Sequence, residues 1–195
     1  AFAGHSAIRT YVMGEAAHQR AATDDEIDRM AALVREAMAS GAVGFATSTN
    51  EPHNGWGGIP MPSRLADERE MSALVRAMGE SGRGLFMLTK GSVTPLAQLE
   101  DIARDSGRPV LIAAMFHNNL APQKVFDELA AMQAARERGH ELIPQVSACP
   151  LTMDFTLRSA YVFESIPAWK AAISVPDETL RELYASAAFR AAVKH

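Results

Sequence analysis

The sequence predicts an α/β fold built from parallel βα units. Short uninterrupted apolar runs, which are typical of buried strands, begin near residues 43, 85, 110 and 142. Amphipathic helical patterns separate these runs along the chain. Because parallel strands need crossover connections, this alternation predicts one parallel sheet that helices cover on both faces. A (β/α) barrel and a doubly wound open sheet both fit the pattern.

The clearest element of the first half is a helix over residues 24–39, whose apolar side chains fall on one 3.6-residue face. Thr23 and Glu26 have the spacing of a capping box, and Gly41 follows the end of the pattern. The elements expected after it are a strand over 43–48, a loop over 49–65, a helix over 67–80 and a strand over 84–89.

The second half continues the alternation and then changes character. The elements expected there are a helix that Thr94 and Pro95 open and Gly107 ends, a strand over 110–116, a helix over 122–138 with Val125, Phe126, Leu129 and Met132 inward, and a strand over 142–146. Beyond them the sequence predicts short helices over 167–173, 176–185 and 187–193. We therefore expect a body over 1–149 and a helical C-terminal segment over 150–195 that packs on it.

Composition excludes several classes of protein. Hydrophobic residues make up 48% and charged residues 22% of the 195 residues, as in an ordinary globular protein. A net charge of −4 gives no support for nucleic-acid binding, and no apolar run approaches the roughly 18 residues of a membrane helix. A lone cysteine, Cys149, and the lack of a visible signal peptide favour the cytoplasm. Since the chain starts at Ala1, we expect it to be an internal part of a longer protein.

Polar residues follow the predicted strands, at the ends where parallel α/β proteins carry their function. His117 follows seven apolar residues and suits a metal or a general base, although a polar loop histidine would look the same. Lys90 also ends an apolar strand, where it could bind a substrate carboxylate, act as a nucleophile, ligate metal when carbamylated, or simply be exposed. Charges on the helices are expected to be solvated. The remaining candidates for substrate binding are His5, Asn50, Arg64 and Asn118.

Motifs of several common enzyme classes are missing. The sequence contains no G-x-G-x-x-G, no G-x-x-x-x-G-K-S/T and no G-x-S-x-G, so dinucleotide, P-loop and serine-hydrolase chemistry have no support. It also lacks H-x-H and H-E-x-x-H. Trp56 among glycines is interpreted either as a cover over a substrate or as a surface anchor.

Three stretches together resemble the D-aminoacylase branch of the amidohydrolase superfamily. They are G-H-S-A-I-R-T-Y-V-M-G over 4–14, the helix from T-D-D-E-I-D-R-M through E-A-M-A-S-G-A-V-G-F-A-T-S over 23–48, and P-S-R-L-A-D-E-R-E-M-S-A-L over 62–74. The resemblance covers about residues 4–120, and Q-V-S-A-C-P-L over 145–151 is similar to a segment further downstream.

The resemblance implies a metal-dependent (β/α)8 barrel that hydrolyses an amide, typically of an N-acyl-D-amino acid. It implies zinc that activates a water molecule, and an aspartate that moves the proton. His117 stands where the family has a histidine ligand, so it is the expected metal ligand. Thr89 or Lys90 stands where another histidine is expected, and the H-x-H pair and the final aspartate have no counterpart. A catalytic zinc site keeps about three protein ligands, so one retained ligand is too few.

The sequence therefore predicts about five of the eight strands of such a barrel, with little or no activity by itself. The expected partner of the parent protein is a small N-acyl amino acid or related amide. Two other interpretations stay open: a non-catalytic α/β binding module derived from the barrel, and a metal-free enzyme that uses Lys90 and His117 differently. Because an open partial barrel exposes two strand edges, we also expect self-association.

Overall fold

The computed structural model describes residues 1–149 and 152–194. It divides into an α/β unit, residues 1–50 and 62–149, and a small unit, residues 51–61 and 152–194. None of the helices within the described ranges combines the length and the apolar character that crossing a membrane requires. The sequence contains no signal that would group the loop 51–61 with the C-terminal residues.

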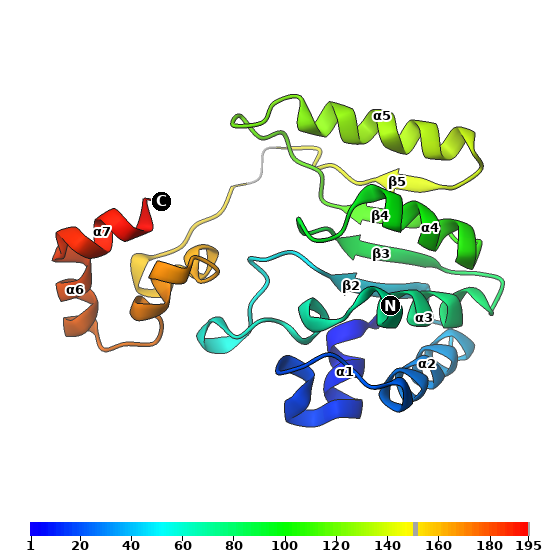
Figure 1. The fold of residues 1–195 in the computed structure, drawn as a ribbon, viewed down its shortest axis with the longest axis horizontal. Coiled ribbons are helices and arrows are strands. Elements are labelled where there is room, and N and C mark those ends of the chain that lie inside the picture. The colour runs from blue at the N-terminus through cyan, green and yellow to red at the C-terminus, as the bar shows by residue number, and fades with distance from the viewer. Residues whose placement is uncertain (150–151, 195) are drawn as a thin grey trace. The chain divides into compact units, whose positions relative to one another are not determined.

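The α/β unit is built on one five-stranded sheet whose strands are all parallel and follow one another in chain order (Figure 1). The strands are β1 (Ala3–Gly4), β2 (Gly44–Ser48), β3 (Leu85–Thr89), β4 (Val110–Ala113) and β5 (Leu142–Pro144). The predicted α/β fold of parallel βα units is therefore confirmed. The outermost strands β1 and β5 each pair with one neighbour.

Five helices accompany the sheet: α1 (His5–Met13), α2 (Asp24–Ala39), α3 (Glu68–Gly79), α4 (Leu96–Ser106) and α5 (Lys124–Glu137). The capping box of α2 is confirmed, since Thr23 accepts from the Glu26 amide and its own amide donates to the Glu26 carboxylate at 2.8 Å. Gly107 ends α4 in the left-handed conformation, as expected, whereas Pro95 rather than Thr94 is its cap residue. Hydrophobic periodicity does not predict α1, because the buried face of this helix carries His5 and Arg9 instead of an apolar stripe.

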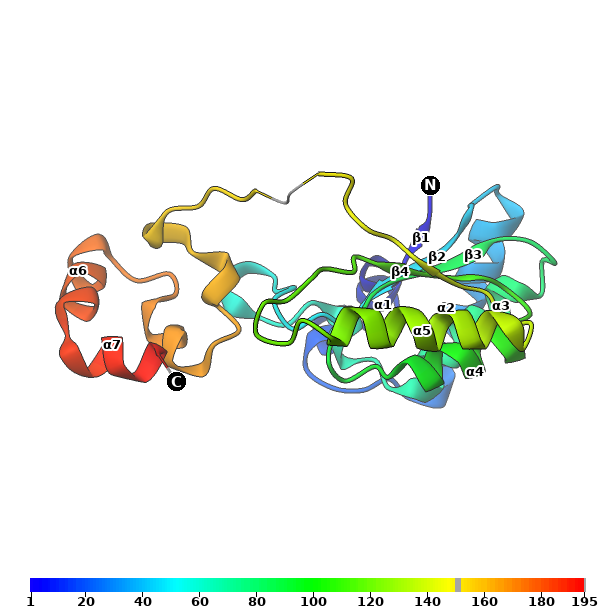
Figure 2. The ribbon, with the colours of Figure 1, turned by 90° about the horizontal axis from the view of Figure 1, so that it is seen from above.

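The two faces of the sheet differ in their cover. The row formed by Phe45, Phe86, Val110 and Leu142 is buried in the core between sheet and helices. The adjacent row points to the opposite face and is only partly buried; it consists of Ala46, Met87, Leu111 and Ile143. Figure 2 shows α3, α4 and α5 together on one side of the sheet. The expectation of helices on both faces is wrong, and the layering matches a barrel wall rather than a doubly wound sheet.

Three neighbouring elements, β4, β5 and α5, differ from the expectation in their ends or in the residues that they bury. The strand expected over 110–116 stops at Ala113, and the one expected to reach Val146 stops at Pro144, which cannot donate to a ladder. Phe126 was expected inward and is 56% exposed. It lies one position beyond Val125, so it falls beside the stripe that leads to the buried Met132.

The small unit has a core of its own. Its helical elements are the short turns Trp56–Gly58, Leu157–Ser159, Tyr161–Phe163 and Pro167–Ala172, followed by α6 (Asp177–Ala185) and α7 (Ala187–Val193). The helices expected in the C-terminal segment are therefore present. Trp169 is the centre of an aromatic cluster, with ring centroids 4.9 Å from Phe163, 5.7 Å from Tyr184 and 5.7 Å from Phe189.

Candidate functional site

Hydroxyl groups bind one another where β2 and β3 end. The Thr49 amide donates to the Thr89 carbonyl at 3.0 Å, and its hydroxyl lies 2.8 Å from the hydroxyl of Thr94. The amide of Gly91 donates to the same Thr49 hydroxyl at 2.9 Å. These bonds are buried, so they join the loops that follow the two strands into one rigid edge.

Lys90 follows β3 directly and lies beside α5. Its Nζ is 3.2 Å from the Glu128 carboxylate, and both side chains are largely buried, with 15% and 22% of their surface exposed. Glu128 was not a candidate in the sequence, although it lies three residues after Val125 and four before Met132, next to the apolar stripe. The ion pair positions the ammonium group near the carboxyl end of the sheet and offsets its charge.

His5, which follows β1, is buried and engaged through both ring nitrogens. Nε2 lies 2.7 Å from Oε1 of Glu70, and Nδ1 lies 2.7 Å from the hydroxyl of Thr47. Burial lowers the pKa of His5 below 6.5, although the carboxylate of Glu70 opposes this shift. In the neutral ring, Nε2–H donates to Glu70 and Nδ1 accepts from Thr47.

Arg9 completes this network from the next turn of α1. Its guanidinium donates to the second carboxylate oxygen of Glu70 and to the carbonyls of Ala17 at 3.2 Å and Arg20 at 2.8 Å. Arg9 and Glu70 are both fully buried, so the expectation of solvated helix charges is wrong for them. Sequence reasoning missed Glu70, and the available signal was its position on the apolar face of α3, four residues before Leu74.

His117 and Asn118 lie on an exposed loop after β4. The His117 ring meets the edge of the Phe126 ring at a centroid distance of 6.5 Å. The Asn118 side-chain oxygen accepts from the amide of Leu120 at 2.9 Å, which shapes a local turn. Both side chains are exposed, so both remain accessible to a ligand.

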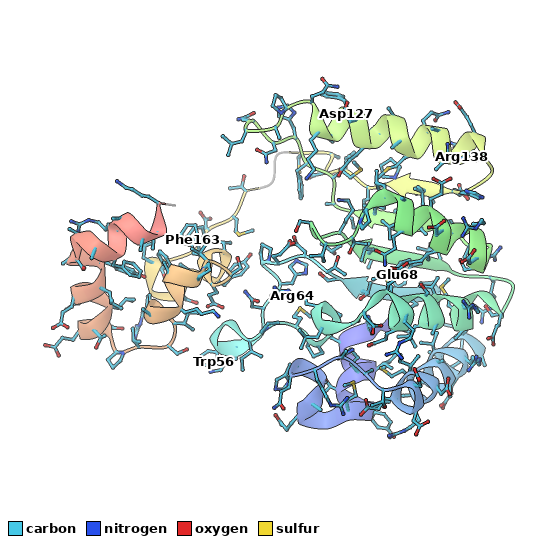
Figure 3. The ribbon with its side chains drawn as sticks, in the orientation of Figure 1. Trp56, Arg64, Glu68, Asp127, Arg138 and Phe163 are labelled. Carbon is cyan, nitrogen blue, oxygen red and sulfur yellow. The ribbon has the colours of Figure 1, made fainter. Side chains whose placement is uncertain are left out.

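Asn50 and Arg64 are half-buried and flank the end of β2. The backbone amide of Asn50 donates to the Ser48 hydroxyl at 3.2 Å. Arg64 belongs to the turn Pro62–Leu65, where Figure 3 labels it. Ser63 in that turn donates to the Ser48 carbonyl at 2.9 Å, which fixes the turn against β2. Ser63 was not among the sequence candidates.

A catalytic zinc of the kind implied by the sequence takes about three protein ligands. Within residues 1–149 and 152–194, no three His, Cys, Asp or Glu side chains are arranged to hold a metal ion. His117 has an aromatic neighbour rather than a second donor in its ring contact. The described residues therefore do not form a complete zinc site by themselves.

Relatives of the chain are found by sequence and by structure. No protein-family model matches the chain. Over 159 residues, 79% of its length, the chain is 31% identical to a D-aminoacylase of Alcaligenes xylosoxydans xylosoxydans, and it spans 28% of that relative. A solved D-aminoacylase structure, from a study of its binuclear metal centre, matches 75% of this chain and 29% of its own, with 27% identity and a TM-score of 0.60.

A second enzyme shares the fold. N-acyl-D-glutamate deacylase from Bordetella bronchiseptica, complexed with zinc and a phosphonate inhibitor that mimics the tetrahedral intermediate, matches 75% of this chain and 30% of its own, with a TM-score of 0.57 and 24% identity. By sequence and by fold, most of the chain is similar to D-aminoacylases of the amidohydrolase family, and it spans less than a third of the relatives it matches.

Proposed function

We propose that the chain is part of the barrel of a longer metal-dependent amidohydrolase that acts on an N-acyl amino acid or a related amide. The observation that carries the proposal is the one-sided sheet. Within the described residues of the α/β unit, the face opposite α3, α4 and α5 presents the half-buried row Ala46, Met87, Leu111 and Ile143. In a closed barrel this face is the inner wall, which side chains of the other strands fill.

The proposed reaction is hydrolysis of the amide bond. Water adds to the carbonyl carbon, the C–N bond breaks, and the departing nitrogen takes up a proton to give a carboxylic acid and an amine. Lys90, already held by Glu128, is the proposed group for the substrate carboxylate, with Asn50, Arg64 and Asn118 as further polar contacts. His5 is the weakest candidate for substrate contact, since both of its nitrogens bind within the protein.

Zinc remains part of the proposal only for the longer protein. D-aminoacylase has a binuclear metal centre and N-acyl-D-glutamate deacylase was solved with zinc, which supports a metal in their relative. His117 would supply one ligand, and the others would come from residues beyond the described ranges. The 195-residue chain alone is accordingly proposed to be inactive.

Activity assays on two proteins test the proposal. Release of free amine from N-acetyl-D-methionine and N-acetyl-L-methionine is measured for the complete product of the encoding gene and for the 195-residue chain. We expect hydrolysis by the complete product only. Hydrolysis by the 195-residue chain alone, or no hydrolysis of any N-acyl amino acid by the complete product, would contradict the proposal.

A non-catalytic binding module is the second candidate. Two observations favour it. The hydroxyl groups at the ends of β2 and β3 bind within the protein, and Lys90 is paired with Glu128. A reacting site would leave such polar groups available to the substrate. Binding of N-acyl amino acids without turnover by the complete gene product would support this candidate over the enzyme.

Self-association of the isolated chain is also proposed, because β1 and β5 each leave one backbone edge unpaired within the sheet. Light scattering of the 195-residue chain tests it. A monodisperse monomer at all concentrations would contradict association through these edges.

A further inference from the structure

The small unit contains a cavity of about 430 Å3 that the proposed amide chemistry does not use. Residues 54–57 and 157–174 of the same unit contribute its lining. The volume falls in the range of roughly 300–1,000 Å3 that is typical of sites for small organic molecules. The residues of the small unit alone therefore determine which ligand this cavity can bind.

Three aromatic residues belong to the lining of the cavity. Trp56, Tyr161 and Trp169 all line it, and they come from three separate turns of the unit. Trp169 is anchored in the aromatic core, whereas Trp56 is 87% exposed and presents its ring to an incoming ligand. Faces of aromatic rings attract organic cations through their quadrupole, and tryptophan does so most strongly.

The charge of the lining favours the same kind of ligand. Glu164 is half-buried, and its carboxylate makes no ion pair with any residue of the described ranges. The other charged lining residue, Arg158, pairs with Asp177 on α6, with Nε 3.0 Å from the carboxylate. The uncompensated charge of the lining is therefore negative.

Backbone bonds close the short segment that carries the exposed tryptophan. The Gly55 amide donates to the Ile59 carbonyl at 2.6 Å, which closes a small hairpin around Trp56 (labelled in Figure 3). Gly58 has a positive φ of 74° and packs so closely that a Cβ there would lie 2.7 Å from Cδ1 of Ile173. The backbone of the hairpin that carries Trp56 is thus seated against the C-terminal part of the unit.

We propose that this cavity binds a small organic ammonium ion, whose cationic head contacts Glu164 and the rings of Trp56 and Tyr161. Trp169 provides the floor for the apolar part of the ligand. This site is independent of the proposed hydrolysis, since its lining contains none of the residues assigned to the amide.

Intrinsic fluorescence tests the proposal directly, because Trp56 and Trp169 are the only two tryptophans of the chain. The 195-residue chain is titrated with phenethylammonium, with the neutral phenethyl alcohol and with the anionic 3-phenylpropionate, which share one aromatic body. We expect saturable quenching by the ammonium ion, with an affinity at least about ten-fold above either analogue, or about 1.4 kcal/mol. Equal affinities, tighter binding of the anion, or no response to any probe would overturn the proposal.

Two matched variants locate the site. Glu164→Gln should abolish the preference for the ammonium ion, while Glu182→Gln, which removes the same charge from the exposed face of α6, should keep it. Trp56→Ala should weaken binding of the ammonium ion several-fold, read from the remaining Trp169. Circular dichroism checks that each variant is folded. An ammonium preference that survives in Glu164→Gln would overturn the assignment.

Discussion

Glu70 on α3 and His5 at the start of α1 are joined by a buried hydrogen bond of 2.7 Å across 65 positions of sequence. The same carboxylate binds Arg9, so one side chain connects α3 to two turns of α1. Because Thr47 of β2 binds the other nitrogen of His5, the network also fixes both helices to the sheet. It thereby stabilises the end of the sheet where β1 and β2 stop.

Removal of Glu70 should destabilise the chain strongly. Glu70→Ala leaves the buried guanidinium of Arg9 without its counter-charge, which costs about 3–5 kcal/mol. Glu80, at the C-terminal end of α3, forms an exposed ion pair with Arg35 of α2. Glu80→Ala should therefore lower the free energy of unfolding by only about 0–1 kcal/mol. Urea unfolding of both variants measures the difference, and similar losses would contradict the structural role of Glu70.

Acidification should weaken the fold through His5. Its folded pKa lies below 6.5 because of burial, so below pH 6.5 the unfolded chain takes up the proton first. The free energy of unfolding therefore falls as the pH drops from 6.5 toward the folded pKa. His5→Gln should flatten this slope in thermal melts between pH 7 and pH 5. An unchanged slope would show that His5 is not the titrating group.

Two carboxylates should govern stability in stronger acid. The Arg20 guanidinium and the Thr23 amide lower the pKa of Glu26 from 4.5 to about 2, and Arg138 with His140 does the same for Glu100. Their stabilisation is complete above pH 4.5 and is lost as the pH falls through about 2. Melting temperatures of Glu26→Gln and Glu100→Gln should depend less on pH in this range than the parent chain.

Close packing of β2 on β3 makes Gly44 irreplaceable. A Cβ at Gly44 would lie 1.9 Å from the backbone oxygen of Leu85, which the pairing of the two strands cannot accommodate. Gly44→Ala should cost about 3 kcal/mol or more. A Cβ at Gly4 on β1 would meet no other atom within 4 Å. Gly4→Ala should therefore change the free energy of unfolding by less than about 0.5 kcal/mol. Equal unfolding midpoints for both variants would refute this packing.

Elements with strong local signals could be predicted from the sequence. The capping box and apolar stripe of α2 and the glycine end of α4 are local features, and each gave the correct element. The order of strands followed from the alternation of apolar runs and amphipathic helices. Lys90 directly follows its strand, as expected, whereas the strand before His117 stops at Ala113, four positions earlier than the residue it was expected to lead into.

Features that depend on distant partners could not be predicted. The network of Glu70 forms between residues far apart in the chain, so the place of Glu70 on the apolar face of α3 indicates burial but does not identify its partners. A half-buried apolar sheet face and a face covered by helices are both built from apolar residues, so the sequence of a strand does not distinguish them. This explains the wrong expectation of helices on both faces. Likewise, the cavity of the small unit joins the loop 51–61 to residues about 100 positions later.

Metal analysis of the complete gene product tests whether this chain supplies part of a metal amidohydrolase barrel, as proposed. Zinc content is measured by atomic emission for the parent protein, for His117→Ala and for His18→Ala, which removes a histidine from the turn after α1. We expect bound zinc in the parent protein and in His18→Ala, and its loss in His117→Ala. Unchanged zinc content in His117→Ala, or efficient amide hydrolysis by a metal-free parent protein, would contradict it.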